Sequence, residues 1–171
     1  MNRRERIEKL KNTDIYPVTC QDLSDGRTNL QVLDAVIKGG ARIIQLREKK
    51  WNKKELYEMA LEFRRRTQAI GVLLIINDHV DIALAAGADG VHLGQEDLPV
   101  EAARRIAPEL IIGASSHSLE EALEAEKKGA DYVNIGPIFP TTTKKGVTRF
   151  LGPSAIGEIG PRLKIPFTTM G

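Results

Sequence analysis

The chain has 171 residues, 42% hydrophobic and 28% charged, which is typical of one globular domain with a substantial core. Its formal net charge of +2 is balanced, and no basic block is interleaved with aromatic residues, so we expect no nucleic-acid partner. A single cysteine, Cys20, excludes an internal disulfide and favours a reducing cytoplasm, and no apolar run approaches the ~20 residues of a membrane span.

Short apolar runs alternate with helical patterns along the whole chain. Helices are predicted at residues 3–11, 29–38, 52–69, 80–86, 99–106, 118–128 and 153–159. Strands are predicted at residues 15–19, 41–46, 72–76, 90–93, 110–112, 132–135 and 165–170. The run Val72–Ile76 is apolar at every position, which suits a strand covered on both faces.

Three helix-to-strand junctions resemble one another: Gly39–Ile43, Gly87–Val91 and Gly129–Val133. Each has a glycine that ends a helix, a tight turn and the start of a strand. Repeated units of this kind predict a parallel sheet with right-handed crossovers. Because no glycine-rich dinucleotide motif follows the first strand, we favour a barrel over a doubly wound sheet and expect one domain over residues 1–171.

The second predicted strand ends in a cluster of charged and polar residues. Side chains alternate along a strand, so Gln45, Arg47 and Lys49 should share one face. A guanidinium fork and an ammonium group together bind phosphate oxygens. The alternative is an exposed strand end at which Glu48 neutralises its neighbours.

Carboxylates follow the third and fourth predicted strands. Asp78, after Asn77, and Asp97 are spaced to lie in corresponding loops. Two carboxylates beside a phosphate site suit Mg²⁺, although Asn77 or Asp78 could equally cap the next helix. His92, within the fourth strand, is more typical of a barrel interior than of a metal site.

Hydroxyl groups follow the fifth and sixth strands. Ser115 could donate to a substrate, while Ser116 or Ser118 could cap the next helix. The loop after Gly136 carries Thr141–Thr143 and Lys144, which fits a phosphate site or, alternatively, a solvated polar loop. With polar groups after five strands and no activated nucleophile, the pattern favours a diphosphate substrate.

Four motifs, in order and with family-like spacing, give the chain a resemblance to thiamine-phosphate synthase. They are QLREK at Gln45–Lys49, ND at Asn77-Asp78, GVHLGQED at Gly90–Asp97 and GPIFPTTTKK at Gly136–Lys145. The resemblance implies a (β/α)8 TIM-type barrel. It also implies a transferase of thiamine biosynthesis that joins a hydroxymethylpyrimidine diphosphate to a thiazole phosphate and releases pyrophosphate by a dissociative, carbocation-like step.

The resemblance also assigns roles to individual residues. It implies that Asp78 and Asp97 bind Mg²⁺ and that Ser115, Arg47 and Lys144 assist catalysis near the leaving group. It implies substrate binding by Gln45, Leu46, Arg47, Glu48, Lys49, Asn77, Ser115, Thr141, Thr142, Thr143, Lys144 and Gly171.

The chain departs from the family at two places. Pro17 and Cys20 occupy positions where the family usually has an apolar residue and an aspartate. The family also continues into an eighth strand with helices, whereas this chain ends at Gly171 after about seven strands. We therefore expect the chain to retain at most diphosphate binding, and to form homo-oligomers through exposed strand edges.

Two other functions compete with the synthase. A thiazole tautomerase of the same fold keeps the Leu-Arg-Glu-Lys strand end, but it lacks the patterns at Gln95–Asp97 and Pro137–Thr143. A non-catalytic fragment that binds diphosphate or self-associates is the second alternative, and a turnover assay separates it from an enzyme.

Overall fold

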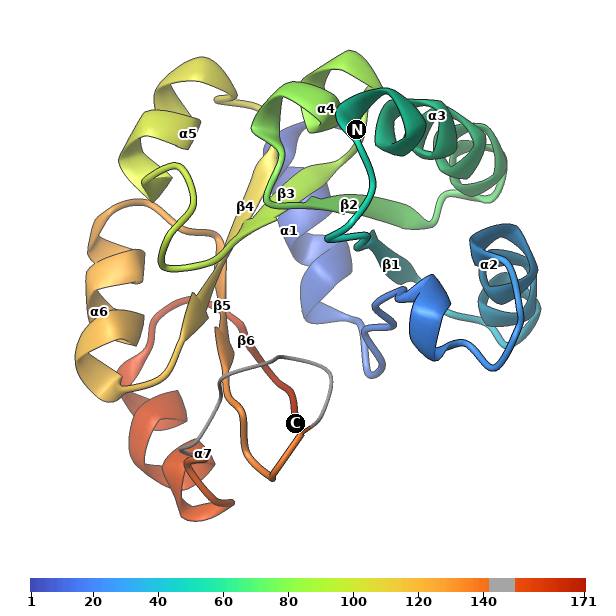
Figure 1. Cartoon of the computed structure of the whole chain (residues 1–171). Coiled ribbons are helices and arrows are strands. Elements are labelled where there is room, and N and C mark those ends of the chain that lie inside the picture. Colours follow the sequence, from blue (N-terminus) through green and yellow to red (C-terminus); the bar gives the residue numbers. More distant parts are fainter. Residues whose placement is uncertain (142–149) are drawn as a thin grey trace. The chain divides into compact units, whose positions relative to one another are not determined.

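A computed structural model describes residues 1–141 and 150–171 (Figure 1). Its helices are α1 (Arg3–Lys11), α2 (Asn29–Lys38), α3 (Lys53–Ile70), α4 (Val80–Ala85), α5 (Val100–Ile106), α6 (Leu119–Lys127) and α7 (Ser154–Ile159), with short 3-10 helices η1 (Gln21–Leu23) and η2 (Gly160–Arg162). Its strands are β1 (Ile43–Leu46), β2 (Leu73–Asn77), β3 (Gly90–Leu93), β4 (Ile111–Ser116), β5 (Tyr132–Ile135) and β6 (Phe167–Thr169). Within the described residues, no helix has the length and apolar character to cross a membrane.

The chain forms two compact units. The N-terminal unit comprises Met1–Val91 and Ala107–Ile111, and the C-terminal unit comprises His92–Ile106 and Ile112–Gly171. The chain passes from the first unit to the second within β3.

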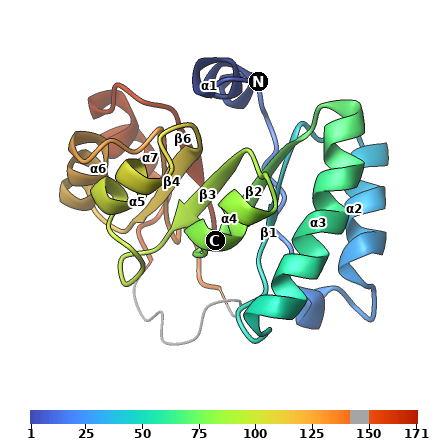
Figure 2. The ribbon, with the colours of Figure 1, turned by 90° about the horizontal axis from the view of Figure 1, so that it is seen from above.

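In the N-terminal unit, β1 and β2 pair in parallel, from Ile43 opposite Leu73 to Leu46 opposite Ile76. Every residue of both strands is buried, as expected for parallel strands covered by helices. Helix α3 packs on β2 through buried side chains that include Phe63, and α2 lies beside α3 (Figure 2).

In the C-terminal unit, β4, β5 and β6 pair in parallel, with Gly113 opposite Tyr132 and Val133 opposite Phe167. Helix α6 packs on β5, and α7 contacts α6. A Cβ atom on Gly113 would lie 2.1 Å from Cζ of Tyr132. Carbon atoms that are not bonded to each other do not come that close, so only glycine at position 113 leaves room for the fully buried ring of Tyr132.

The predicted helix-to-strand junctions are confirmed by their backbone geometry. Gly40, Gly87 and Gly129 all have positive φ, at 85°, 64° and 95°. Glycine adopts this conformation without the steric cost that a Cβ atom brings, which lets the chain leave each helix and enter the next strand.

The expected first strand, residues 15–19, is wrong in extent. Only Val18 forms a bridge, with Gln45, although Pro17 O accepts from Gln45 N at 2.9 Å and Thr19 N donates to Gln45 O at 2.9 Å. Pro17 has no N–H to extend the ladder, and η1 begins at Gln21.

The fifth predicted strand is longer than expected. It runs through Ser116 as β4, so Ser115 and Ser116 lie in the strand and not in a loop. Ser118 is the N-cap of α6 and accepts from Glu121 N at 3.1 Å. The Glu121 carboxylate accepts from His117 N at 2.7 Å, one residue before the cap.

Candidate functional site

The residues in the second half of β1 and directly after it divide between the interior and the surface of the N-terminal unit. Gln45 is 2% exposed and donates to the Tyr16 hydroxyl at 3.0 Å, while the side chain of Leu46 is fully buried. Glu48 is also buried and accepts from Gln21 N at 2.9 Å. Glu48 is therefore used to hold η1, a role that differs from the neutralising one considered from the sequence.

Arg47 and Lys49 lie beyond the end of β1, where strand alternation no longer fixes their directions. The Arg47 backbone N–H donates to Thr19 Oγ1 at 2.9 Å, and its side chain is half-buried. Lys49 is exposed and pairs with Asp78, with 2.5 Å between Nζ and Oδ2. The structure thus joins two of the predicted site residues, one from each of two adjacent strand ends.

Asp78 has a backbone conformation that is uncommon for a residue with a side chain. Its φ is +62°, and His79 N donates across it to Asn77 O at 2.7 Å, which closes a tight three-residue turn. The N-cap of α4 is His79 and makes no side-chain capping bond. The prediction that Asn77 or Asp78 is the N-cap of α4 is therefore wrong. A positive φ at a residue with a side chain, as at Asp78, is a strained conformation, and such strain is concentrated at functional sites.

In the C-terminal unit, the residues after β3 form a tight turn around Asp97. Asp97 Oδ2 accepts from Gly94 N at 2.6 Å, and Asp97 N donates to Gly94 O at 3.3 Å. The turn holds the carboxylate next to the end of β3. A fixed carboxylate in this place is suited to binding a cation or a polar ligand.

Ser115 belongs to a buried hydrogen-bonded chain of three side chains. Its hydroxyl lies 3.0 Å from His92 Nε2, and His92 Nδ1 lies 3.0 Å from the Tyr132 hydroxyl. The Ser115 carbonyl accepts from Gln95 Nε2 at 2.5 Å. The interior position expected for His92 is confirmed. Sequence reasoning missed Tyr132, because Gly113, the residue opposite it, lies on another strand.

The segment after β5 is held against the end of β6. Ile138 N donates to Met170 O at 2.8 Å, and Gly171, with φ +108°, approaches Pro137 so closely that a Cβ atom would lie 2.7 Å from Pro137 Cβ. Thr141 is described, whereas Thr142, Thr143 and Lys144 lie outside the described residues. Their phosphate-binding roles stay predictions.

The predicted metal ligands belong to different units, Asp78 to the N-terminal and Asp97 to the C-terminal one. Among residues 1–141 and 150–171, no three His, Cys, Asp or Glu side chains gather as a metal cluster. The Mg²⁺ assignment needs only two carboxylates and substrate oxygens. It stays a prediction.

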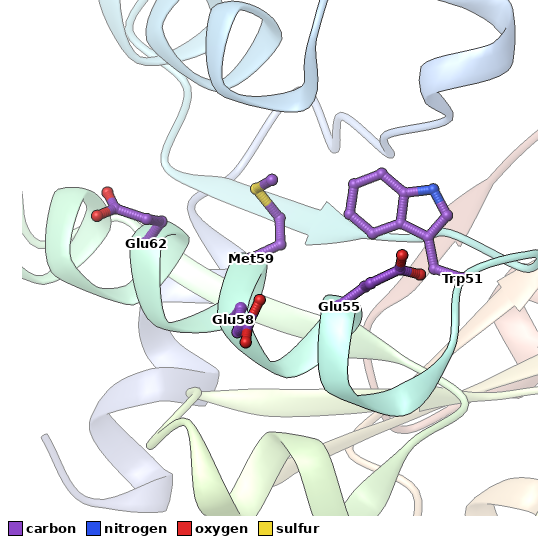
Figure 3. A pocket seen from close by; sticks show the side chains of 5 residues that line it. All are labelled: Trp51, Glu55, Glu58, Met59 and Glu62. Carbon is purple, nitrogen blue, oxygen red and sulfur yellow. The ribbon is translucent and has the colours of Figure 1, made fainter.

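A pocket of about 540 Å³ lies elsewhere, along α3 (Figure 3). Its lining residues are Trp51, Glu55, Glu58, Met59 and Glu62. Glu55 belongs to the capping box with Asn52, and hydrogen bonding to Arg65 lowers the pKa of Glu62. None of the residues that line this pocket is a predicted site residue, so the pocket does not correspond to the predicted site.

Comparison with known proteins extends over almost the entire chain. A family model described as thiamine monophosphate synthase matches residues 15–171. The thiamine-phosphate synthase of Pyrococcus abyssi is 48% identical over 164 residues, which are 96% of this chain and 76% of that protein. The enzyme of Shouchella clausii is 44% identical over 163 residues, or 95% of this chain and 78% of that protein.

A solved structure agrees with this assignment. The thiamine phosphate pyrophosphorylase from Pyrococcus furiosus superposes with a TM-score of 0.83 at 44% identity, over 91% of this chain and 73% of that one. The predicted fold class, a parallel α/β fold of the TIM type, is thereby confirmed. The synthase name of these relatives also agrees with the preference for a synthase over a tautomerase. The chain belongs to the thiamine-phosphate synthase family.

Proposed function

We propose that the chain joins a hydroxymethylpyrimidine diphosphate to a thiazole phosphate, forming thiamine phosphate and pyrophosphate. The observation that supports this most strongly is the 48% identity to a thiamine-phosphate synthase over 96% of the chain. In the proposed step, the bond from the pyrimidine methylene carbon to the diphosphate oxygen breaks, and its electron pair leaves with pyrophosphate. The lone pair of the thiazole nitrogen then forms the new C–N bond to that carbon.

The N-terminal unit would hold the leaving diphosphate. Arg47 presents a guanidinium fork at the end of β1, with its backbone fixed by Thr19. Lys49 supplies an exposed positive charge at the same strand end, paired with Asp78. These cations would stabilise negative charge as it develops on the departing group, and no protein nucleophile is needed.

Asp78 and Asp97 would bind Mg²⁺. The donor chemistry fits, because both residues offer hard carboxylate oxygens and both lie in tight turns directly after a strand. Mg²⁺, when bound with the substrate, would supply positive charge to the phosphate oxygens. We further propose a reducing cytoplasm as the setting, since Cys20 is the one cysteine of the chain and is free.

Isothermal titration with inorganic pyrophosphate and Mg²⁺ tests the diphosphate site directly. Arg47→Lys keeps the charge but loses the fork, so we expect affinity to weaken by about 1–3 kcal/mol. Arg65→Lys is the matched control, because Arg65 lies on the exposed face of α3, paired with Glu62, and its change should leave affinity unaltered. Equal affinity in the wild type and Arg47→Lys would remove Arg47 from the site.

Turnover separates the enzyme from a chain that only binds diphosphate. Formation of thiamine phosphate by the 171-residue chain, abolished or sharply reduced by Asp97→Asn, would support the synthase reaction. Pyrophosphate binding without turnover would instead support the second candidate, a diphosphate-binding chain without catalysis. Wild-type turnover and metal dependence in Asp97→Asn would exclude Asp97 as a Mg²⁺ ligand.

A further inference from the structure

Tyr132, His92 and Ser115 form a continuous chain of side-chain hydrogen bonds. Tyr132 is fully buried, and His92 is 7% exposed. Both ring nitrogens of His92 have a hydroxyl at 3.0 Å, which is the distance of a good hydrogen bond. The imidazole therefore connects the inner hydroxyl of Tyr132 with the outer hydroxyl of Ser115.

The surrounding structure holds this chain in place. Gly113 provides the space that the Tyr132 ring occupies, since a Cβ atom there would overlap the ring. The ring of His92 lies 5.5 Å from that of Tyr132, measured between centroids. Gln95 binds the Ser115 carbonyl, so both the backbone and the side chain of Ser115 have fixed partners.

The direction of the hydrogen bonds depends on which nitrogen of His92 carries the proton. With the proton on Nε2, His92 donates to Ser115 Oγ and accepts from the Tyr132 hydroxyl on Nδ1. The Ser115 proton then points to a third group. With the proton on Nδ1, the Ser115 hydroxyl donates back to His92 and offers only its oxygen to a ligand.

We propose that His92 and Tyr132 are positioning residues that make the Ser115 hydroxyl a hydrogen-bond donor to the leaving diphosphate. This inference rests on the proposed function, because an anionic leaving group requires a donor at Ser115. In this arrangement the Tyr132 hydroxyl donates to His92 Nδ1, so that Nε2 carries the ring proton and donates to Ser115 Oγ, and the serine proton is directed to the ligand. A hydroxyl fixed before the substrate binds needs no reorientation during the reaction.

A double-mutant cycle tests this coupling in the full chain. We expect Ser115→Ala to lower kcat by about 100-fold, the effect of removing one fixed donor. Tyr132→Phe keeps the ring that fills the Gly113 space but loses the hydroxyl, and it should lower kcat about tenfold with less than a twofold change in KM. In the Ser115→Ala background, Tyr132→Phe should change kcat by less than twofold. Equal losses of kcat in both backgrounds would show that Tyr132 acts independently of Ser115 and would overturn the proposal.

A conservative variant separates positioning from folding. His92→Gln retains an amide N–H donor for Ser115 and should keep more activity than His92→Leu when both variants are assayed well below their measured unfolding temperatures. If His92→Leu were as active as His92→Gln, no donor at this position would be required and the proposal would fail.

Nuclear magnetic resonance of ¹⁵N-labelled histidine gives a readout that does not depend on turnover. We expect the Nε2–H tautomer at His92 in the wild type and a mixture of tautomers in Tyr132→Phe. A wild-type Nδ1–H tautomer would overturn the proposal, even if the enzyme were active. Absence of both turnover and pyrophosphate binding would contradict the proposed function instead, and the tautomer would still test the hydrogen-bond direction.

Discussion

Asp89 of the N-terminal unit and Asp131 of the C-terminal unit occupy equivalent junctions. Each follows a Gly-Ala pair and exchanges two hydrogen bonds with the first part of the preceding strand. Asp89 N donates to Leu74 O at 2.8 Å and Asp89 Oδ2 accepts from Leu74 N at 3.0 Å, while the corresponding distances between Asp131 and Ile112 are 2.7 and 2.8 Å. The side chains of both aspartates are almost fully buried.

Each buried carboxylate pairs with an arginine from the helix before the preceding strand. Arg64 of α3 lies 2.8 Å from Asp89, and Arg104 of α5 lies 2.5 Å from Asp131. A buried charge is costly unless it is paired and hydrogen-bonded, and both conditions are met here. Helix, strand and next junction are thereby tied together by the same set of bonds in both units.

The two junctions differ in what else their arginines bind. Arg104 also donates to the carbonyl of Gly129, the glycine that ends the preceding helix, at 3.1 Å. At Asp89 a second arginine, Arg6 of α1, brings Nε within 3.2 Å of Oδ1 as an ion pair. Arg6 also donates from Nη1 to Glu109 O at 2.7 Å. The junction at Asp89 therefore also holds helix α1 in place.

This difference explains how α1 is held although its sequence is poor in apolar residues. Leu10 is its one buried residue. Arg6 pairs with the Asp89 carboxylate and donates to the backbone carbonyl of Glu109, and Lys9 donates from Nζ to the backbone carbonyl of Gly71. Because charged contacts carry so much of the attachment, α1 should be less stably held than the strands and helices that meet at Asp89.

The largest expected effect comes from removing either buried carboxylate. Asp89→Ala and Asp131→Ala each leave a partly buried arginine and a buried strand N–H without their carboxylate acceptor, so each should lower the free energy of unfolding by about 3–5 kcal/mol. Urea titration measures this change. The exposed Asp14 provides a control, since Asp14→Ala should change stability by less than about 0.5 kcal/mol. A small loss at only one of the two junctions would mean that they are not energetically equivalent.

A smaller and more local effect is expected from Arg6→Ala. It removes one charged hydrogen bond and one ion pair, worth about 1.5–3 kcal/mol, while Arg64 still pairs with Asp89. Amide hydrogen exchange should accelerate in α1 and remain unchanged in α3. The control is Arg4→Ala, on the exposed face of the same helix. Faster exchange throughout the N-terminal unit would show instead that Arg6 supports the whole junction.

The parts of the fold that depend on neighbouring residues were predictable from the sequence. Asn52 was expected to cap α3, and the structure shows the full capping box with Glu55. The Gly-Ala-Asp repeat correctly indicated two junctions, but it did not reveal the role of the aspartates. Their arginine partners lie 25 and 27 residues away, a separation that no local pattern covers.

The candidate site was predictable in composition more than in geometry. The sequence placed Lys49 and Asp78 at adjacent strand ends, and the structure pairs them. It did not indicate that Asp78 would adopt positive φ, because that conformation is uncommon for residues other than glycine, even though aspartate adopts it more often than most. Tyr132 was missed because it reads as an ordinary apolar position in a strand, and only its contact with His92 shows a polar role.

The smallest expected effect comes from an ion pair that lacks the burial of the two junctions. Lys53 Nζ lies 2.7 Å from Asp81 Oδ2, yet these side chains are 65% and 59% exposed. Hydrogen bonding to Lys53 lowers the pKa of Asp81 below its ordinary value of 3.8. The folded state therefore binds this proton less readily than the unfolded state, so the pair adds stability above about pH 4 and loses it as the pH falls through the lowered pKa. Solvent screening limits that contribution to a few tenths of a kcal/mol. Urea titration of Asp81→Asn should show a loss of this size at pH 7 that disappears once the pH has fallen below the lowered pKa of Asp81. A loss at pH 7 as large as that in Asp89→Ala would mean that charge pairing, and not burial, sets the strength of these contacts.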